Sequence, residues 1–253
     1  MKLIRTMARL QDLYMLGVTA PVVALKKPYY FREILEQMDY AGPGSFSITL
    51  LVALFIGMAL SLQTSAELTS IGFNMYTGKI VGLSVIREIG PVAIALGFAG
   101  RVGSGMTSEL ASMTIEHQID VIRVFGVSVT KKLVAPRIIG SIIMLPLLTV
   151  IGDFVAIIGG YFIAVFTFHQ SGPLYWSQIK EMITLENFVT GAVKPFAFGY
   201  IIAVISCYMG LSAHGGAKGL RLATTHAVVF SIVAIIVIDF ILGRVLLLIF
   251  RSA

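Results

Sequence analysis

Five apolar stretches, each long enough to cross a lipid bilayer as a helix, alternate with more polar connections along the chain. They lie at about residues 44–63, 80–100, 138–166, 188–211 and 227–250. A bilayer core is spanned by about 20 residues of α-helix, and only a helix satisfies its own backbone polar groups there within one segment. The pattern predicts an all-α polytopic membrane protein with about five transmembrane helices. It divides the chain into an N-terminal segment, residues 1–43, and a transmembrane domain, residues 44–253.

Residues 2–14 have the pattern of an amphipathic helix. Leu3, Met7, Leu10 and Tyr14 recur at helical spacing, and charged residues occupy another face. This arrangement is typical of a helix that lies in the membrane surface. An ordinary amphipathic helix packed on protein is the alternative.

Composition supports the membrane assignment. Of the 253 residues, 57% are hydrophobic and only 13% are charged, and the mean hydropathy is +0.91. Soluble domains contain about 25% charged residues, so a soluble globular domain is excluded. A single cysteine, Cys207, also excludes a disulfide framework within the chain.

Lys and Arg are distributed unevenly between the connections. The N-terminal segment contains six, and the four connections that follow contain one, five, one and two. Because positive residues are retained on the cytoplasmic side, we expect the N-terminus and the even-numbered connections to be cytoplasmic. With five spans the C-terminus is then periplasmic. These basic connections and anionic lipid explain the net charge of +6 without nucleic acid.

Six charged residues fall inside the predicted spans, where an unpaired charge costs about 2.5–3.5 kcal/mol near the helix centre. They are Arg87, Glu88, Asp153, Lys194, Asp239 and Arg244. We select Glu88, Lys194 and Asp239 as substrate or gate candidates in a cavity that opens outward. Ion pairing that only fixes the helix bundle is the alternative, and it is favoured for Arg87 and Asp153. Arg244 is expected to extend outward to the membrane surface.

Small residues recur at every fourth position of the third stretch. Gly152, Ala156, Gly160 and Ala164 form this row, and such rows let helices approach closely. We expect helix packing here, within the chain or between two copies, in preference to a substrate groove.

Motifs for catalysis or cofactor binding are missing or incomplete. The stretch from Gly72 to Lys79 resembles a phosphate-binding loop, but five residues separate its glycines where the motif has four. Ile80 also stands where the motif needs Ser or Thr. The four histidines are far apart and form no metal-binding pair, and no GxSxG nucleophile motif occurs. We expect a non-enzymatic chain that binds no cofactor and no metal.

The connection at 101–137 is predicted to contain a helix from Met106 to Phe125. Apolar residues repeat there at helical spacing, and Gly126 provides a natural stop. A cytoplasmic amphipathic helix can lay its apolar face into a groove of a partner protein. A helix lying on the membrane surface is the alternative.

Several sequence blocks then follow one another in a specific order. They are Arg87–Pro91, Ala99–Ser104, Glu109–Leu110, Gln118–Asp120, Gly126–Val127, Pro136–Arg137 and Gly216–Val229. Over about residues 45–250, the chain resembles the MlaE (YrbE-like) permease family, the membrane subunits of Mce-associated ABC lipid transporters.

The resemblance implies a homodimeric permease in the bacterial inner membrane that moves phospholipid between the inner and outer membrane. It implies three further partners: a cytoplasmic ATPase that uses ATP and Mg, a STAS-domain protein and a periplasmic MCE-domain ring. It also matches Glu88, Lys194 and Asp239 to functionally sensitive positions. An ion-coupled secondary transporter of an amphipathic small molecule is the alternative function.

The same resemblance makes the segment at about 106–126 a coupling helix that seats in the ATPase. The residues expected to take part are Glu109, Ile115, Glu116, His117, Ile119, Asp120, Ile122, Arg123 and Phe125.

Overall fold

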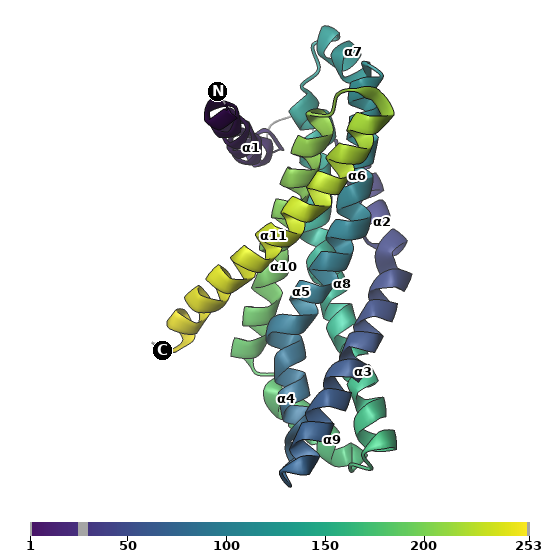
Figure 1. The fold of residues 1–253 in the computed structure, drawn as a ribbon, viewed down its shortest axis with the longest axis vertical. Helices are drawn as coiled ribbons and strands as arrows, with labels where there is room; N and C mark the ends of the chain where they lie inside the picture. The colour runs from purple at the N-terminus through teal and green to yellow at the C-terminus, as the bar shows by residue number, and fades with distance from the viewer. Residues whose placement is uncertain (1, 25–29, 252–253) are drawn as a thin grey trace. The chain divides into compact units, whose positions relative to one another are not determined.

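The computed structural model describes residues 2–24 and 30–251, with side chains over 11–23 and 30–250. This part of the chain is helical apart from short turns and contains no β-strand (Figure 1). The expected all-α fold is therefore confirmed.

The α-helices are α1 (Lys2–Ala24), α2 (Phe31–Ala41), α3 (Phe46–Ser70), α4 (Thr77–Ser84), α5 (Gly90–Phe98), α6 (Ser104–Ile115), α7 (Gln118–Val124), α8 (Ala135–Phe162), α9 (Gly172–Met182), α10 (Leu185–Leu211) and α11 (Gly216–Arg251). Turns of π-helix join some of them: η3 (Val85–Ile89), η4 (Ala99–Gly103), η5 (Thr130–Val134) and η6 (Ile163–Thr167).

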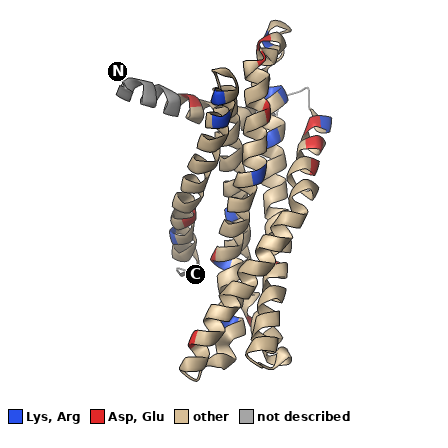
Figure 2. Ribbon diagram, turned by 45° about the vertical axis from the view of Figure 1, so that its right-hand side comes forward, with Lys and Arg blue, Asp and Glu red and all other residues tan. Residues whose placement is uncertain are grey.

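Five helical runs within the described residues are long and apolar enough to cross a membrane. They are Phe31–Ser70, Asn74–Ile115, Thr130–Thr167, Leu185–Leu211 and Gly216–Phe250. Charged residues are sparse along them (Figure 2). Each run contains one predicted stretch and extends beyond it, because backbone hydrogen bonding continues where the side chains become polar. Arg101, which we counted with the second connection, therefore lies inside the second run.

The continuous helix predicted from Met106 to Phe125 is wrong at its centre. Helix α6 ends at Ile115, and His117 adopts a left-handed conformation with a φ of 59°. The His117 carbonyl accepts the first backbone bonds of α7, from the N–H groups of Asp120 and Val121 at 3.2 Å each. The chain thus restarts as a second helix, which ends before Gly126, where φ is +71°.

Helix α1 is longer than the predicted segment 2–14 and contains Pro21. Proline has no N–H group, so the carbonyl of Gly17, four residues earlier, has no helical donor. The hydroxyl of Tyr200 in α10 donates a hydrogen bond to this carbonyl at 2.9 Å. Tyr14 is 69% exposed, while the side chains of Leu3, Met7 and Leu10 lie outside the described residues.

The chain forms two compact units, and the boundaries between them fall within or beside helices. One unit comprises Met1–Gly44, Phe98–Met144 and Phe198–Ile235, and the other comprises Ser45–Gly97, Leu145–Ala197 and Ile236–Ala253.

The core of the first unit joins α1, α6, α8 and α10. Its buried members are Ala20, Leu110, Val134, Ile138, Ala203, Val204 and Cys207. Beside it, Nη2 of Arg137 lies 2.6 Å from Oε2 of Glu109, and Nη1 donates to the Leu133 carbonyl at 2.7 Å. The Arg137 side chain is only 4% exposed, so this ion pair fastens α6 to α8.

In the second unit, small residues let α3 and α8 approach closely. A side chain at Gly57 would clash with the backbone of Ala156, and the Ser61 hydroxyl donates to the Gly160 carbonyl at 2.8 Å. The small-residue row of α8 therefore serves helix packing within the chain, as we expected. Helix α9 packs against α4 (Figure 1).

Candidate functional site

The second unit brings Glu88, Lys194 and Asp239 together. Nζ of Lys194 contacts the carboxylate of Glu88 and lies 2.8 Å from Oδ1 of Asp239. The Lys194 side chain is fully buried, whereas Glu88 is 50% exposed and Asp239 is 21% exposed. We call these three residues the ion cluster. The candidates chosen from three separate apolar stretches thus meet at one place.

Glu88 owes its position to a π-helical turn. The N–H of Gly90 bonds to the carbonyl of Val85, five residues earlier. Pro91 follows and has no N–H to offer the Arg87 carbonyl, so regular α-helical bonding is interrupted just after Glu88. Isolated π-turns within helices are frequent at functional sites.

Lys194 reaches Glu88 because α10 packs closely against η3. A side chain at Gly191 would clash with the carbonyl of Ile86 in η3. Gly191 and Lys194 are three residues apart and therefore share a helix face. The close contact at Gly191 thus carries the ammonium group to the turn that bears Glu88.

Helix α11 contributes Asp239 to the ion cluster and places Gly243 beside it. Gly243 follows Asp239 by one turn on the same face. A Cβ atom at Gly243 would lie 3.8 Å from Oε1 of Glu88 and 4.0 Å from Nζ of Lys194. Both distances are those of ordinary van der Waals contact, so the glycine leaves room for about a methyl group beside both charged groups.

The two contacts of Lys194 differ in hydrogen bonding and in exposure: Nζ donates a hydrogen bond to Glu88 and none to Asp239, while Glu88 is the more exposed acid. Burying an ammonium group costs several kcal/mol, which must be offset by close partners. Asp239 is the more shielded partner, although its Oδ1 makes no hydrogen bond and its contact is purely ionic. The half-exposed Glu88 interacts through a more polar medium, which weakens attraction between charges. Glu88 is therefore the partner that exchanges more easily.

The other charges in the apolar stretches lie near the ion cluster or close to the end of α11. Nη1 of Arg87 lies 3.4 Å from Oδ1 of Asn187 and 3.9 Å from Oε1 of Glu186, so Arg87 ties η3 to the first turn of α10. Oδ1 of Asp153 is buried without a hydrogen bond and fills the space beside Gly90. The Arg244 side chain is exposed.

The polar residues proposed for coupling form local contacts in the first unit. Asp120 lies 3.1 Å from Nδ1 of His117 and 3.4 Å from Nη1 of Arg123. Glu116 accepts hydrogen bonds from Ser112 and Gln118, each at 2.7 Å. Glu109 instead pairs with Arg137, as described above.

The apolar residues proposed for coupling separate into buried and exposed ones. Ile119 is 3% exposed, Ile115 and Ile122 are intermediate, and Phe125 is 77% exposed. Two residues outside our selection, Val121 and Val124, are 53% and 86% exposed. Val124 and Phe125 follow Val121 by three and four residues, which places all three on one face of a helix. This second apolar stripe could have been recognised in the sequence from that spacing.

Within the described residues, no group of three or more His, Cys, Asp or Glu side chains is arranged to hold a metal ion.

Comparisons with known proteins place this chain in a family. The sequence model described as permease MlaE matches residues 34–245. A probable ABC transporter permease protein of Rickettsia typhi is 33% identical over 222 residues, which cover 88% of this chain and 86% of the relative. A probable ABC transporter permease protein of Synechocystis is 36% identical over 212 residues, covering 84% and 81%. The chloroplastic protein TRIGALACTOSYLDIACYLGLYCEROL 1 of Arabidopsis thaliana is 34% identical over 234 residues, covering 90% and 67%. The chain therefore belongs to the MlaE permease family and is a multi-pass ABC transporter permease.

Proposed function

We propose that this permease moves phospholipid between the inner and outer membrane, driven by ATP hydrolysis in a separate subunit. The ion cluster is the observation that carries the proposal. A buried lysine held by one shielded and one half-exposed carboxylate offers an exchangeable site for a phosphate group. The plant relative, which bears the name of a glycerolipid, supports a lipid as the substrate class.

In this proposal the lipid phosphate replaces Glu88 as a partner of Lys194. Asp239 holds the ammonium group in place while the exchange occurs. When Glu88 returns to Lys194, the headgroup loses its partner and is released. The ion cluster thus acts as both binding group and gate.

The energy for this exchange would come from a cytoplasmic ATPase with its ATP and Mg, while this chain holds no cofactor and is not itself an enzyme. Nucleotide binding by the partner would favour one of two permease conformations through its differential affinity. We assign the contact to the coupling region, about residues 106–126, where α7 exposes Val121 and Val124, and Phe125 directly after it is also exposed.

The other proposed partners and the membrane location follow from the assignment of the chain as a lipid-transporting permease. We propose a homodimer in the bacterial inner membrane, with a STAS-domain protein on the cytoplasmic side and an MCE-domain ring on the periplasmic side. The distribution of Lys and Arg supports a cytoplasmic N-terminus and a periplasmic C-terminus. Exposed apolar residues along α11, among them Val233, Ile236 and Phe240, offer surface for lipid or for the second copy.

The test is phospholipid transfer between vesicles by the permease reconstituted with its ATPase. Lys194→Met and Glu88→Gln should each lower ATP-dependent transfer at least tenfold, with normal membrane insertion. Lys180→Met removes an exposed lysine of α9 and should leave transfer unchanged. Full transfer by the Lys194 and Glu88 variants would contradict the role of the ion cluster. Transfer driven by an ion gradient without ATP would instead favour a secondary transporter.

A further inference from the structure

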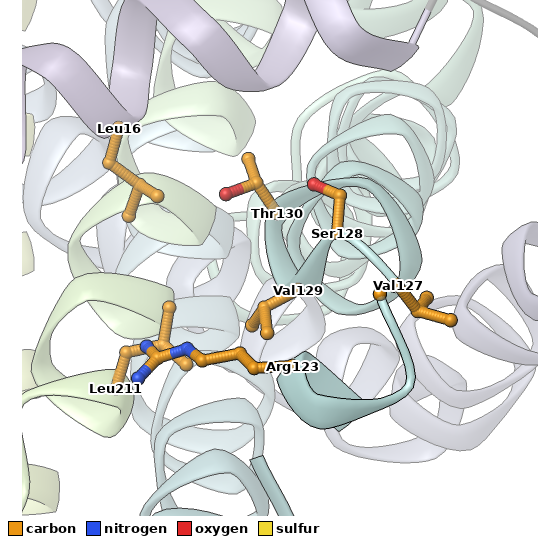
Figure 3. Close-up of a pocket in the computed structure, with 8 residues that line it drawn as sticks. Leu16, Arg123, Val127, Ser128, Val129, Thr130 and Leu211 are labelled. Atoms are coloured by element: carbon orange, nitrogen blue, oxygen red, sulfur yellow. The ribbon is translucent and has the colours of Figure 1, made fainter. Parts of the chain in front are cut away.

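An open pocket of about 510 Å³ lies in the first unit, where the α7–α8 connection meets α1 and the end of α10 (Figure 3). Its lining includes Arg123 from α7, Ser128 and Thr130 from the connection, Leu16 from α1 and Leu211 from α10. The side chains of Ser128 and Thr130 lie below α1 in the view of Figure 3, and the Arg123 guanidinium extends toward Leu211. The lining thus combines one charged and two hydroxyl side chains with apolar ones.

The charge of this region favours an anion. Arg123 is the charged residue in the pocket lining, and Lys131 and Lys132 follow in the α7–α8 connection. Arg123 has an acidic partner in Asp120, whose Oδ1 lies 3.4 Å from Nη1 of Arg123. The two side chains are 59% and 65% exposed, and an exposed pair of this kind contributes at most about 1 kcal/mol. A ligand phosphate can therefore compete with Asp120 for the guanidinium.

The wall provided by α1 favours a lipid over a free anion. Leu16 faces the pocket, and the same helix exposes Tyr14, Met15 and Val18 at 69%, 52% and 46%. A surface helix with such residues packs against acyl chains. In a molecule with a phosphate at one end and hydrocarbon at the other, the phosphate matches Arg123 and the two hydroxyl side chains, and the hydrocarbon matches α1.

We propose that this pocket binds the phosphate-bearing headgroup of an anionic membrane lipid. Arg123 pairs with the phosphate, Ser128 and Thr130 donate hydrogen bonds to the headgroup, and the acyl chains lie along α1. This lipid is a bound ligand of the permease and not its cargo, because the pocket shares no residue with the ion cluster.

Binding of soluble dihexanoyl phosphatidylglycerol to the purified full-length chain tests the proposal by calorimetry. Arg123→Gln should weaken binding about tenfold or more, since it removes a charge-assisted hydrogen bond. Asp120→Asn removes the competing acid and should strengthen binding, a gain that mere structural damage would not produce. The matched control, Arg221→Gln, removes an exposed charge of α11 and should leave the Kd unchanged.

Two further ligands test whether the pocket prefers an anionic lipid to a zwitterionic lipid and to free phosphate. Dihexanoyl phosphatidylcholine and inorganic phosphate should both bind more weakly than phosphatidylglycerol. Equal binding of inorganic phosphate would mark a free-phosphate site and overturn the lipid assignment. Equal losses of affinity in the Arg123 and Arg221 variants would show that the anionic lipid is attracted non-specifically by positive charge, and would overturn the assignment of this pocket as its binding site. Lys194→Met should retain binding of phosphatidylglycerol. Loss of binding in this variant would show that the lipid occupies the ion cluster instead. The pocket proposal would then fail, while the proposed function would not be affected.

Discussion

The ammonium nitrogen of Lys194 lies 2.8 Å from Oδ1 of Asp239, and this is the more shielded of its two contacts with a carboxylate. Removing a close partner from a buried charge leaves that charge uncompensated, which costs more than losing an exposed pair. The two acids of the ion cluster should therefore differ in their importance for stability.

Asp239→Asn should lower the free energy of unfolding more than Glu88→Gln, by about 2 kcal/mol against less than about 1 kcal/mol. Thermal unfolding of the purified permease in lipid nanodiscs measures both. Glu181→Gln, which changes an exposed acid of α9, serves as the control. Equal melting temperatures for the Asp239 and Glu88 variants would show that burial does not distinguish the two contacts.

Gly243 should tolerate a small side chain and reject a large one. Alanine places its Cβ atom 3.8 Å from Glu88 and 4.0 Å from Lys194, which is ordinary van der Waals contact. Gly243→Ala should therefore keep phospholipid transfer within about twofold of the unmodified permease, and its added helix propensity of about 1 kcal/mol should raise stability. Gly243→Leu places a larger side chain against both charged groups and should therefore disrupt the ion cluster and abolish transfer while the protein still inserts. Normal transfer by Gly243→Leu would show that close packing of α11 beside the ion cluster is not needed for transfer.

The Arg137–Glu109 pair should respond unequally to removal of each partner. Glu109→Gln leaves the buried guanidinium with a weaker partner and should destabilise the protein by about 1–3 kcal/mol. Arg137→Met leaves only the Glu109 carboxylate, whose side chain is 55% exposed and can be hydrated, so the loss should be smaller. Denaturant titration of both variants gives the comparison. A larger loss for Arg137→Met would indicate that packing of the arginine stem outweighs its charge.

Tyr200→Phe should loosen α1, because it removes the donor to the Gly17 carbonyl that Pro21 leaves without a helical partner. An unsatisfied buried carbonyl costs about 1–3 kcal/mol. Hydrogen exchange at residues 11–23 should therefore accelerate. In a Pro21→Ala background the helix supplies its own donor, so the same substitution should have little further effect. Equal acceleration in both backgrounds would assign the effect to the aromatic ring instead of the hydrogen bond.

Much of this architecture was predictable because bilayer-spanning helices impose a strong pattern on the sequence. The cost of charges in apolar stretches also identified Glu88, Lys194 and Asp239. Their mutual contact was not predictable, because residues 88, 194 and 239 are joined only by tertiary packing at positions such as Gly191. The break at His117 was missed for a different reason: apolar residues recur at helical spacing on both sides of it, so the periodicity does not reveal a single left-handed residue between two helices.

The π-turns η3 and η4 have a consequence for how this helical run tolerates insertion and deletion. An α-helix turns by about 100° per residue, and a π-turn accommodates one additional residue. A one-residue deletion within Val85–Ile89 would let this segment become regular α-helix and leave the flanking helices close to their present angular phase, because the turn absorbs the residue that is removed. Val81 and Gly82, buried in α4, would still face their present neighbours. The chain should therefore tolerate a change of length within η3 better than elsewhere in this helical run, where each deleted residue rotates the side chains that follow by about 100°.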